Sequence, residues 1–250
     1  MISIFAVDPS DWKDLELKVS KIFADIGFSV EVEKDISLVR GKVNVDVIAI
    51  KKHLTTKEVH IAECKWWSEP IPKQVVHSFR TILSDSGANA GYIISKEGFQ
   101  KGAHEAAENS NLNLLSFQEF QTEFRTRWLD GVVDELEALG YPLRKFADPM
   151  ESFFDNYVDK LSDDKKKEFS RLVNKYYNIA TKSFRGIYKN LISGQLELDW
   201  IEKIIVDNSK DFPKGVKVNC LMDYFQYLKD VCSIGVAEFD AVFGEPLRKN

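Results

Sequence analysis

The chain has few of the residues that build disulfide frameworks or zinc sites. Its 250 residues include three cysteines and four histidines, and the cysteines (Cys64, Cys220 and Cys232) have no metal-ligand spacing. An odd number of widely spaced cysteines argues against a disulfide framework and fits a reducing compartment. Cys64 lies near His60 and His77, but no second Cys or His pair completes four zinc ligands. We therefore expect a cytoplasmic protein without structural zinc.

Long apolar runs and an excess of positive charge are also missing. No run approaches the roughly 18 residues of a membrane-spanning helix, so we expect no membrane partner. The content of 44% hydrophobic and 29% charged residues is typical of a globular protein. The net charge of −5 differs from that of many nucleic-acid-binding domains, which are basic. A nucleic-acid enzyme of this composition would depend on local basic patches and on metal ions.

Three common catalytic signatures are absent as well. The sequence contains no Walker A loop, no GxGxxG after a predicted strand and no GxSxG elbow. These absences argue against an ATPase, a dinucleotide-dependent enzyme and a serine hydrolase.

The first half of the chain alternates helical and strand patterns. Helices are predicted where apolar residues recur at helical spacing, and strands where they alternate or form short runs. The predicted order is a helix over 11–27, strands over 28–32, 43–50 and 58–65, a helix over 71–85, a strand over 90–95, a helix over 98–110 and a strand over 112–115. Residues 35–42 are either a further strand or a loop. This order predicts an α/β fold with a mixed sheet flanked by helices.

From Phe120 onward, helical periodicity replaces the strand signal. Gly140 is expected to end a helix and Pro142 to lie in a connection, while the last helical segment is either one helix or a pair interrupted at Gly235. Predicted helices cover 128–139, 150–161, 163–193, 196–208 and 218–242. We therefore divide the chain into an α/β domain over 1–120 and an all-α domain over 121–250. The second domain would serve recognition, oligomerisation or regulation.

Two predicted strands carry charged residues at the edge of the apolar core, Val45-Asp46-Val47-Ile48-Ala49 and His60-Ile61-Ala62-Glu63-Cys64-Lys65. Residues two apart in a strand share a face, so Glu63 and Lys65 point the same way. The same rule places Val43, Val45 and Val47 on one face and Asp46 on the other. Asp46 would then lie opposite Glu63 and Lys65 in a hairpin. Charged groups in such a place seldom lack a partner or a metal.

Two carboxylates and an ammonium suit metal-dependent phosphodiester hydrolysis. Mg²⁺ prefers carboxylate oxygens together with waters and a phosphate, which makes Asp46 and Glu63 candidate ligands for Mg²⁺ or Mn²⁺. Lys65 would orient a metal-bound water or stabilise charge in the transition state. Glu16, on the first helix, would complete the site through a second metal or a metal-bound water. The alternative is structural: Glu63 and Lys65 on an exposed strand face, and Glu16 facing solvent.

The order of Glu16, Asp46 and Glu63-x-Lys65 resembles the PD-(D/E)xK nuclease superfamily, and within it the Mrr-type restriction endonuclease domain. The resemblance covers roughly residues 11–118. It includes Asp25-Ile26-Gly27-Phe28, the strand Gly91-Tyr92-Ile93-Ile94-Ser95, and Gly98-Phe99-Gln100-Lys101-Gly102-Ala103 at the start of a helix. Two features depart from the family pattern. Arg40-Gly41-Lys42-Val43-Asn44-Val45 stands where many members are glycine-rich, and Glu63 stands where many have Gln.

The resemblance implies a restriction-endonuclease-like fold in which the acidic residues bind Mg²⁺ and the lysine assists DNA hydrolysis. By position, the metal ligands are Asp46 and Glu63, the lysine is Lys65, and Glu16 is the helix carboxylate. It further implies an Mg²⁺-dependent deoxyribonuclease in bacterial restriction or anti-phage defence, acting as a homodimer or higher oligomer. If the nuclease is instead the effector of the helical half, a sensor or ATPase is a further candidate partner. The alternative is an inactive nuclease fold that binds nucleic acid or another protein, with the helical half carrying the role.

Other residues are candidates for contact with DNA. Lys73 and Gln74 begin the helix after the second charged strand, where they either reach a phosphate or form a solvated face. Eight Lys or Arg residues, including Lys175 and Arg185, lie between positions 165 and 189 with one acid and interleaved aromatics. This pattern fits either a DNA-binding patch or a basic helix face over a helical core. Trp66-Trp67 would either stack on bases or pack over the sheet edge.

Overall fold

The structure, a computed structural model, describes residues 3–147, 155–192 and 198–244. The chain forms two compact units. One is Val7–Trp128, and the other combines Met1–Ala6 with Leu129–Asn250. Helix α4 (Phe117–Ala147) contributes residues to both units. The boundary placed at 120/121 from the sequence falls inside this helix.

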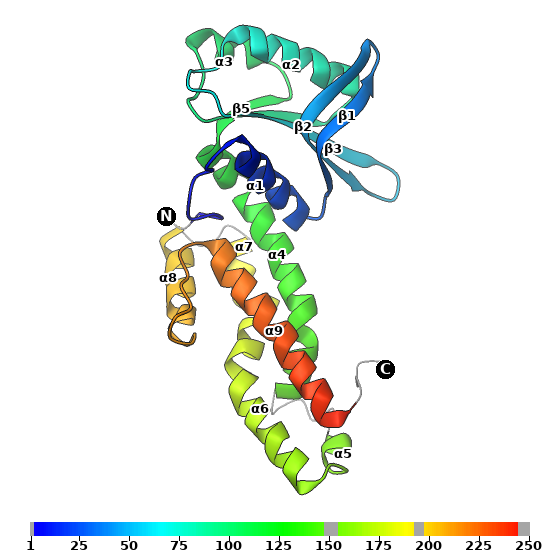
Figure 1. Ribbon diagram of the computed structural model, residues 1–250, viewed down its shortest axis with the longest axis vertical. Coiled ribbons are helices and arrows are strands. Elements are labelled where there is room, and N and C mark those ends of the chain that lie inside the picture. Colours follow the sequence, from blue (N-terminus) through cyan, green and yellow to red (C-terminus); the bar gives the residue numbers. More distant parts are fainter. Residues whose placement is uncertain (1–2, 148–154, 193–197, 245–250) are drawn as a thin grey trace. The chain divides into compact units, whose positions relative to one another are not determined.

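Val7–Trp128 is built on a five-stranded mixed sheet (Figure 1). The strands lie across it in chain order: β1 (Ser29–Leu38), β2 (Gly41–Lys52), β3 (Lys57–Lys65), β4 (Ala90–Ser95) and β5 (Leu112–Ser116). Strands β1, β2 and β3 pair antiparallel, whereas β4 pairs parallel with both β3 and β5. The parallel connections contain helices, as such crossovers usually do. The mixed sheet with flanking helices is confirmed, and the undecided segment 35–42 is shared between β1, a turn and β2.

Helices cover both faces of this sheet (Figure 1). On one face, α1 (Trp12–Asp25) buries apolar residues at helical spacing, and its start is capped by the Asp11 carboxylate, which accepts from the Asp14 N–H at 2.8 Å. Phe23 of α1 contacts the rings of Phe120 and Phe124 from the first turns of α4, with centroids 5.6 and 5.1 Å away. The indole N–H of Trp128 donates to Asp25 at 2.8 Å.

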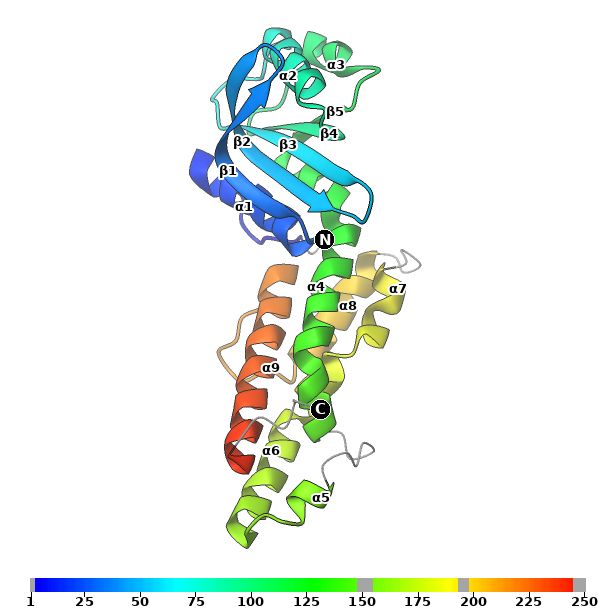
Figure 2. The same cartoon turned by 90° about the vertical axis from the view of Figure 1, so that its right-hand side faces the viewer.

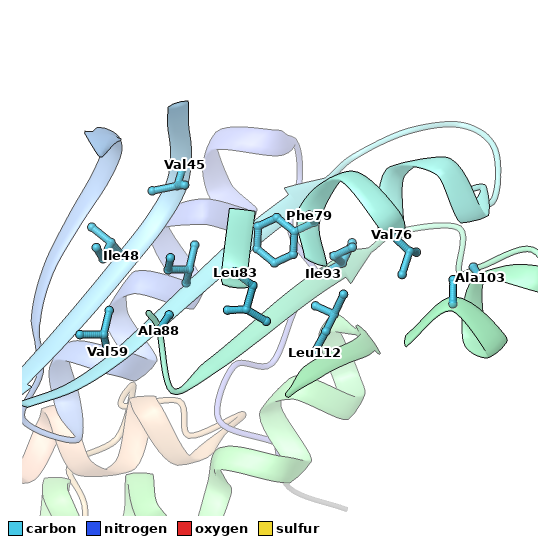
Figure 3. Close-up of a cluster of buried hydrophobic side chains, with 12 residues drawn as sticks. Val45, Ile48, Val59, Val76, Phe79, Leu83, Ala88, Ile93, Ala103 and Leu112 are labelled. Carbon is cyan, nitrogen blue, oxygen red and sulfur yellow. The ribbon is translucent and has the colours of Figure 1, made fainter. Parts of the chain in front are cut away.

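The opposite face is covered by α2 (Lys73–Ser86) and α3 (Lys101–Ala107). Figure 3 shows Val76, Phe79 and Leu83 of α2 directed toward the strands, where they meet side chains such as Ile93. The side chains of this cluster are nearly all inaccessible to solvent. Burial of this apolar surface is the main term that holds the helices on the sheet.

Strand β2 does not keep the predicted alternation. Val45 and Ile48 belong to the same buried cluster (Figure 3), although an odd spacing places side chains on opposite faces of a regular strand. The direction of the side chains therefore changes at Asp46–Val47, and the prediction that Val45 and Val47 share a face is wrong. The pairing with β1 is interrupted at the same place, between Val45 and Val47. Opposite this gap, Glu33 has a φ of +49°, which few residues other than glycine adopt.

All the regular secondary structure described in the second unit is helical. Besides the rest of α4, it contains α5 (Asp155–Val158), α6 (Asp163–Lys182), a 3₁₀ turn η1 (Arg185–Tyr188), α7 (Lys189–Ile192), α8 (Leu198–Ser209) and α9 (Leu221–Phe243). Figures 1 and 2 show α4, α6 and α9 packed along one another, which confirms a helical second half. In the described part of the chain, no helix combines the length and apolar content needed to cross a membrane.

Two predicted helix boundaries in this half are wrong, and one open alternative is resolved. Helix α4 continues through Gly140 and Pro142. Of the two alternatives for residues 218–242, the single helix is confirmed, because α9 continues through Gly235. The long helix predicted over 163–193 instead ends at Lys182 and is followed by η1 and α7. Residues 150–154 of the helix predicted over 150–161 lie outside the described residues, and the rest is helical only in α5 (Asp155–Val158).

Gly140 has a packing role that explains its place inside a helix. A Cβ on Gly140 would overlap the side chain of Ser183. One turn further along α4, the Arg144 guanidinium donates to the Ser183 carbonyl at 3.3 Å. The missing side chain therefore lets the chain after α6 approach α4 closely.

We expect Gly140→Ala to destabilise the protein by about 1–3 kcal/mol through overpacking, despite the better helix propensity of alanine. Gly102→Ala, inside α3, is the matched control, because the new Cβ would lie 3.5 Å from Lys73 in ordinary contact. That control should gain about 0.5–1 kcal/mol. Thermal unfolding of both variants checks the prediction, and a similar gain for both would contradict it.

Candidate active site

The Asp46 side chain occupies the point where the pairing of β2 with β3 ends. The last backbone pair is Val47 with Ala62, and the same register places Asp46 opposite Glu63 one step further. At this step the Asp46 side chain takes the place of a backbone carbonyl as hydrogen-bond acceptor. The Cys64 N–H donates to Asp46 Oδ2 at 2.7 Å. The hydrogen bond fixes the carboxylate between the two strands. The structure thus brings together Asp46 and Glu63, as the sequence predicted.

Lys65 completes this group from the end of β3. Its ammonium donates to Glu63 Oε1, and the two side chains are 17% and 19% exposed. An ion pair that is mostly shielded from water is stronger than one on the surface. The ammonium is therefore held beside one of the two carboxylates rather than moving freely in solvent.

Glu16 reaches the same region from α1. It is one of the few buried charged residues, with 6% of its surface exposed, so the solvent-facing alternative is wrong. Burial, and after it the negative charges of Asp46 and Glu33, raise the pKa of Glu16 to about 7, although the positive charge of Lys65 acts in the opposite direction. Near neutral pH, Glu16 therefore exists in both protonation states.

Glu63 is also perturbed by its surroundings. Burial raises the pKa of Glu63, the charge of Asp46 adds to this effect, and Lys65 counteracts it. Adjacent carboxylates raise each other's pKa when they compete for the charged state. Clusters of perturbed carboxyl groups are typical of functional sites.

Sequence reasoning missed Glu33. This exposed residue on β1 acts electrostatically on Glu16 and lies opposite Asp46 at the gap in the β1–β2 pairing. Its left-handed φ belongs to an irregularity of the kind that bulges introduce beside functional sites. The sequence signal was weak, because Glu33 reads as one more polar residue of an edge strand.

The donor set fits a hard divalent cation. Two carboxylates that accept waters and a substrate phosphate as further ligands are the usual protein contribution to an Mg²⁺ site. A cation would also relieve the repulsion that raises the pKa of Glu63. Burial raises the pKa of the Cys64 thiol well above its usual range, which disfavours a thiolate ligand. Within residues 3–147, 155–192 and 198–244, no three or more His, Cys, Asp or Glu side chains are grouped to hold a metal.

The predicted DNA contacts fall into two groups. Lys73 and Gln74 are exposed at the first two positions of α2. In the helical unit, by contrast, Lys175 lies 2.8 Å from Glu238, and Arg185 lies 2.6 Å from Asp130 and also pairs with Asp134. These ion pairs lower the positive charge that the basic segment offers to a nucleic acid.

Comparison with known proteins identifies the class of this sheet unit. Residues 7–123 match the family model Mrr_cat, described as a restriction endonuclease. The chain therefore carries a Mrr_cat restriction endonuclease domain over these residues, which confirms the resemblance seen in the sequence. The match spans all five strands and the residues Glu16, Asp46, Glu63 and Lys65.

A solved structure described as "Crystal Structure of Protein of Unknown Function AF1548" is similar with 17% identity and a TM-score of 0.37, over 72% of this chain and 99% of that chain. No curated protein matches the chain.

The raised pKa of Glu16 predicts a pH-dependent cost to folding. Because the folded protein binds this proton more tightly than the unfolded chain, stability falls as pH rises from about 4.5 to about 7. Glu16→Gln removes this cost. We expect it to stabilise the protein on the order of 2 kcal/mol more at pH 8 than at pH 4.5. Thermal unfolding at both pH values measures the difference.

The exposed Glu105 on α3 offers the control for this measurement. Glu105→Gln should shift the melting temperature by a similar small amount at both pH values. An equal effect of Glu16→Gln at pH 4.5 and pH 8 would contradict a buried, electrostatically coupled carboxyl.

Proposed function

We propose that the Val7–Trp128 unit is a metal-dependent DNA endonuclease with Asp46, Glu63 and Lys65 at its active site. The observation that supports this most is the meeting of two carboxylates and an ammonium where the β2–β3 pairing ends, within a restriction endonuclease domain. The implied setting is bacterial restriction or anti-phage defence. Mg²⁺ is the proposed cofactor, and Mn²⁺ offers the same preference for oxygen ligands.

Asp46 and Glu63 would hold the metal, which supplies positive charge to the scissile phosphate and lowers the pKa of a bound water. The Cys64 N–H orients the Asp46 carboxylate for this task. The Lys65 ammonium, which pairs with Glu63, would donate to the attacking water or to a phosphate oxygen as negative charge develops. Glu16, with a pKa of about 7, is suited to accept a proton near neutral pH.

We further propose a role for the rest of the molecule. Lys73 and Gln74 of α2 would contact DNA, with Lys175 and Arg185 as additional candidates in the helical unit. Because a duplex has two strands, double-strand cleavage by a single-site enzyme calls for two copies, so we propose a homodimer or higher oligomer. The helical unit would recognise the target, join the copies, or hold the nuclease inactive until a sensor or ATPase partner signals.

Plasmid nicking tests the active site. Purified wild-type protein with Mg²⁺ should nick supercoiled DNA, and EDTA should abolish the reaction. Asp46→Ala and Lys65→Ala should each lower the rate by about 100-fold or more, because the first removes a proposed metal ligand and the second removes an ammonium that stabilises developing negative charge. Asp207→Asn, which removes an exposed carboxylate on α8, should leave the rate unchanged. Equal residual cutting by all variants would refute the assigned site.

Salt dependence tests the DNA contacts. Lys73→Ala should weaken DNA binding several-fold and reduce the slope of log affinity against log salt by about one, the expected loss of one phosphate contact. Lys210→Ala, an exposed lysine paired with Asp207, serves as the control. We expect smaller effects from Lys175→Ala and Arg185→Ala, because acidic side chains already partner both residues. An unchanged slope for Lys73→Ala would favour a solvated face.

A further inference from the structure

Two tryptophans follow the candidate catalytic lysine directly. Trp66 and Trp67 extend the chain beyond the end of β3, and Trp66 is partly buried. Trp67 keeps 44% of its surface exposed. The exposed part of the Trp67 ring is therefore available for contact with a ligand.

A lysine ammonium lies near the face of each ring. Lys65 Nζ is 5.8 Å from the centroid of Trp67, and Lys96 Nζ is 5.2 Å from the centroid of Trp66. Lys96 is also 3.1 Å from the exposed Glu97, a surface pair of small energy. Aromatic rings interleaved with cations are the combination that proteins use to bind unpaired nucleotides, because rings stack on bases and cations attract phosphates.

The segment that carries the tryptophans is fixed at both ends. On one side, the Lys96 N–H donates to the Lys65 carbonyl at 3.1 Å, which ties the ends of β3 and β4 together. On the other, the buried Ile71 forms a parallel bridge with Phe99, and its N–H donates to the Gly98 carbonyl at 2.9 Å. A ring held on a fixed segment loses little conformational entropy when a ligand stacks on it.

From this arrangement we propose that Trp67, supported by Trp66 and Lys96, is a stacking site for an unpaired nucleobase of the DNA substrate. The inference rests on the proposed nuclease function and adds to it a preference for DNA that contains an unpaired base. A base next to the scissile phosphate leaves the duplex stack and lies against the exposed indole, while Lys96 faces the neighbouring phosphate. The protein then favours DNA in which such a base is already unpaired, because no stacking within the duplex has to be broken.

The test compares two duplexes of the same sequence, one perfectly paired and one with a single extra unpaired thymidine. Binding is followed by fluorescence anisotropy of labelled DNA in EDTA, so that no cleavage occurs. The wild-type protein should bind the bulged duplex roughly tenfold more tightly, as expected for one base stacked on an aromatic ring. Trp67→Leu should remove this preference, and Trp67→Phe, which keeps a ring, should retain part of it.

Tyr141→Leu is the matched control. Tyr141 is 49% exposed and has Lys145 Nζ 4.7 Å from its ring centroid, but it belongs to the helical unit. This variant should keep the wild-type preference. A general loss of folding would weaken binding to both duplexes equally, so the ratio of the two affinities isolates the stacking contribution.

Two results would overturn the inference: equal binding of both duplexes by the wild-type protein, or an unchanged preference in Trp67→Leu. Plasmid nicking by the same preparations separates this failure from failure of the proposed function. Nicking without a bulge preference retains the nuclease and removes the stacking site. A bulge preference that depends on Trp67, without nicking in Mg²⁺ or Mn²⁺, keeps the stacking site and removes the nuclease activity.

Discussion

The hydrogen bond from the Cys64 backbone to the Asp46 carboxylate organises the candidate site. A regular ladder would have used this N–H for a backbone carbonyl and left the aspartate on a strand face. Instead, the side chain lies between β2 and β3, directly beside Glu63. The electrostatics of the site follow in part from this position. Burial raises the pKa of Glu63 and of Glu16, the negative charge of Asp46 raises both further, and the positive charge of Lys65 counteracts it.

The elements of the sheet unit could be predicted from the sequence because their patterns are local. Apolar spacing defined α1, and the short run from Ala90 to Ser95 corresponds to β4 residue for residue. The faces of β2 could not be predicted, because they depend on how Asp46 bonds to a neighbouring strand. Glu33 was missed for the same reason, since its unusual backbone angle arises from the same gap in pairing.

The helical unit was harder to predict because its helix ends and ion pairs depend on residues that are distant in the sequence. Gly140 reads as a helix terminator in the sequence, yet inside α4 it makes room for Ser183. The basic segment reads as a DNA-binding patch, but its partners come from distant positions: Glu238 for Lys175, and Asp130 with Asp134 for Arg185. The residues of the candidate site were predictable because family spacing identifies them, whereas pairings across helices leave no such pattern.

Helix α4 has a practical consequence for dissecting this protein. Its first turns supply Phe120, Phe124 and Trp128 to the packing around α1, and the same uninterrupted helix then continues into the second unit. A shortened chain ending at residue 120 would remove Phe124 and Trp128 from the sheet unit and expose the apolar surface that they cover. A truncation that isolates the sheet unit therefore has to end beyond residue 128, inside α4.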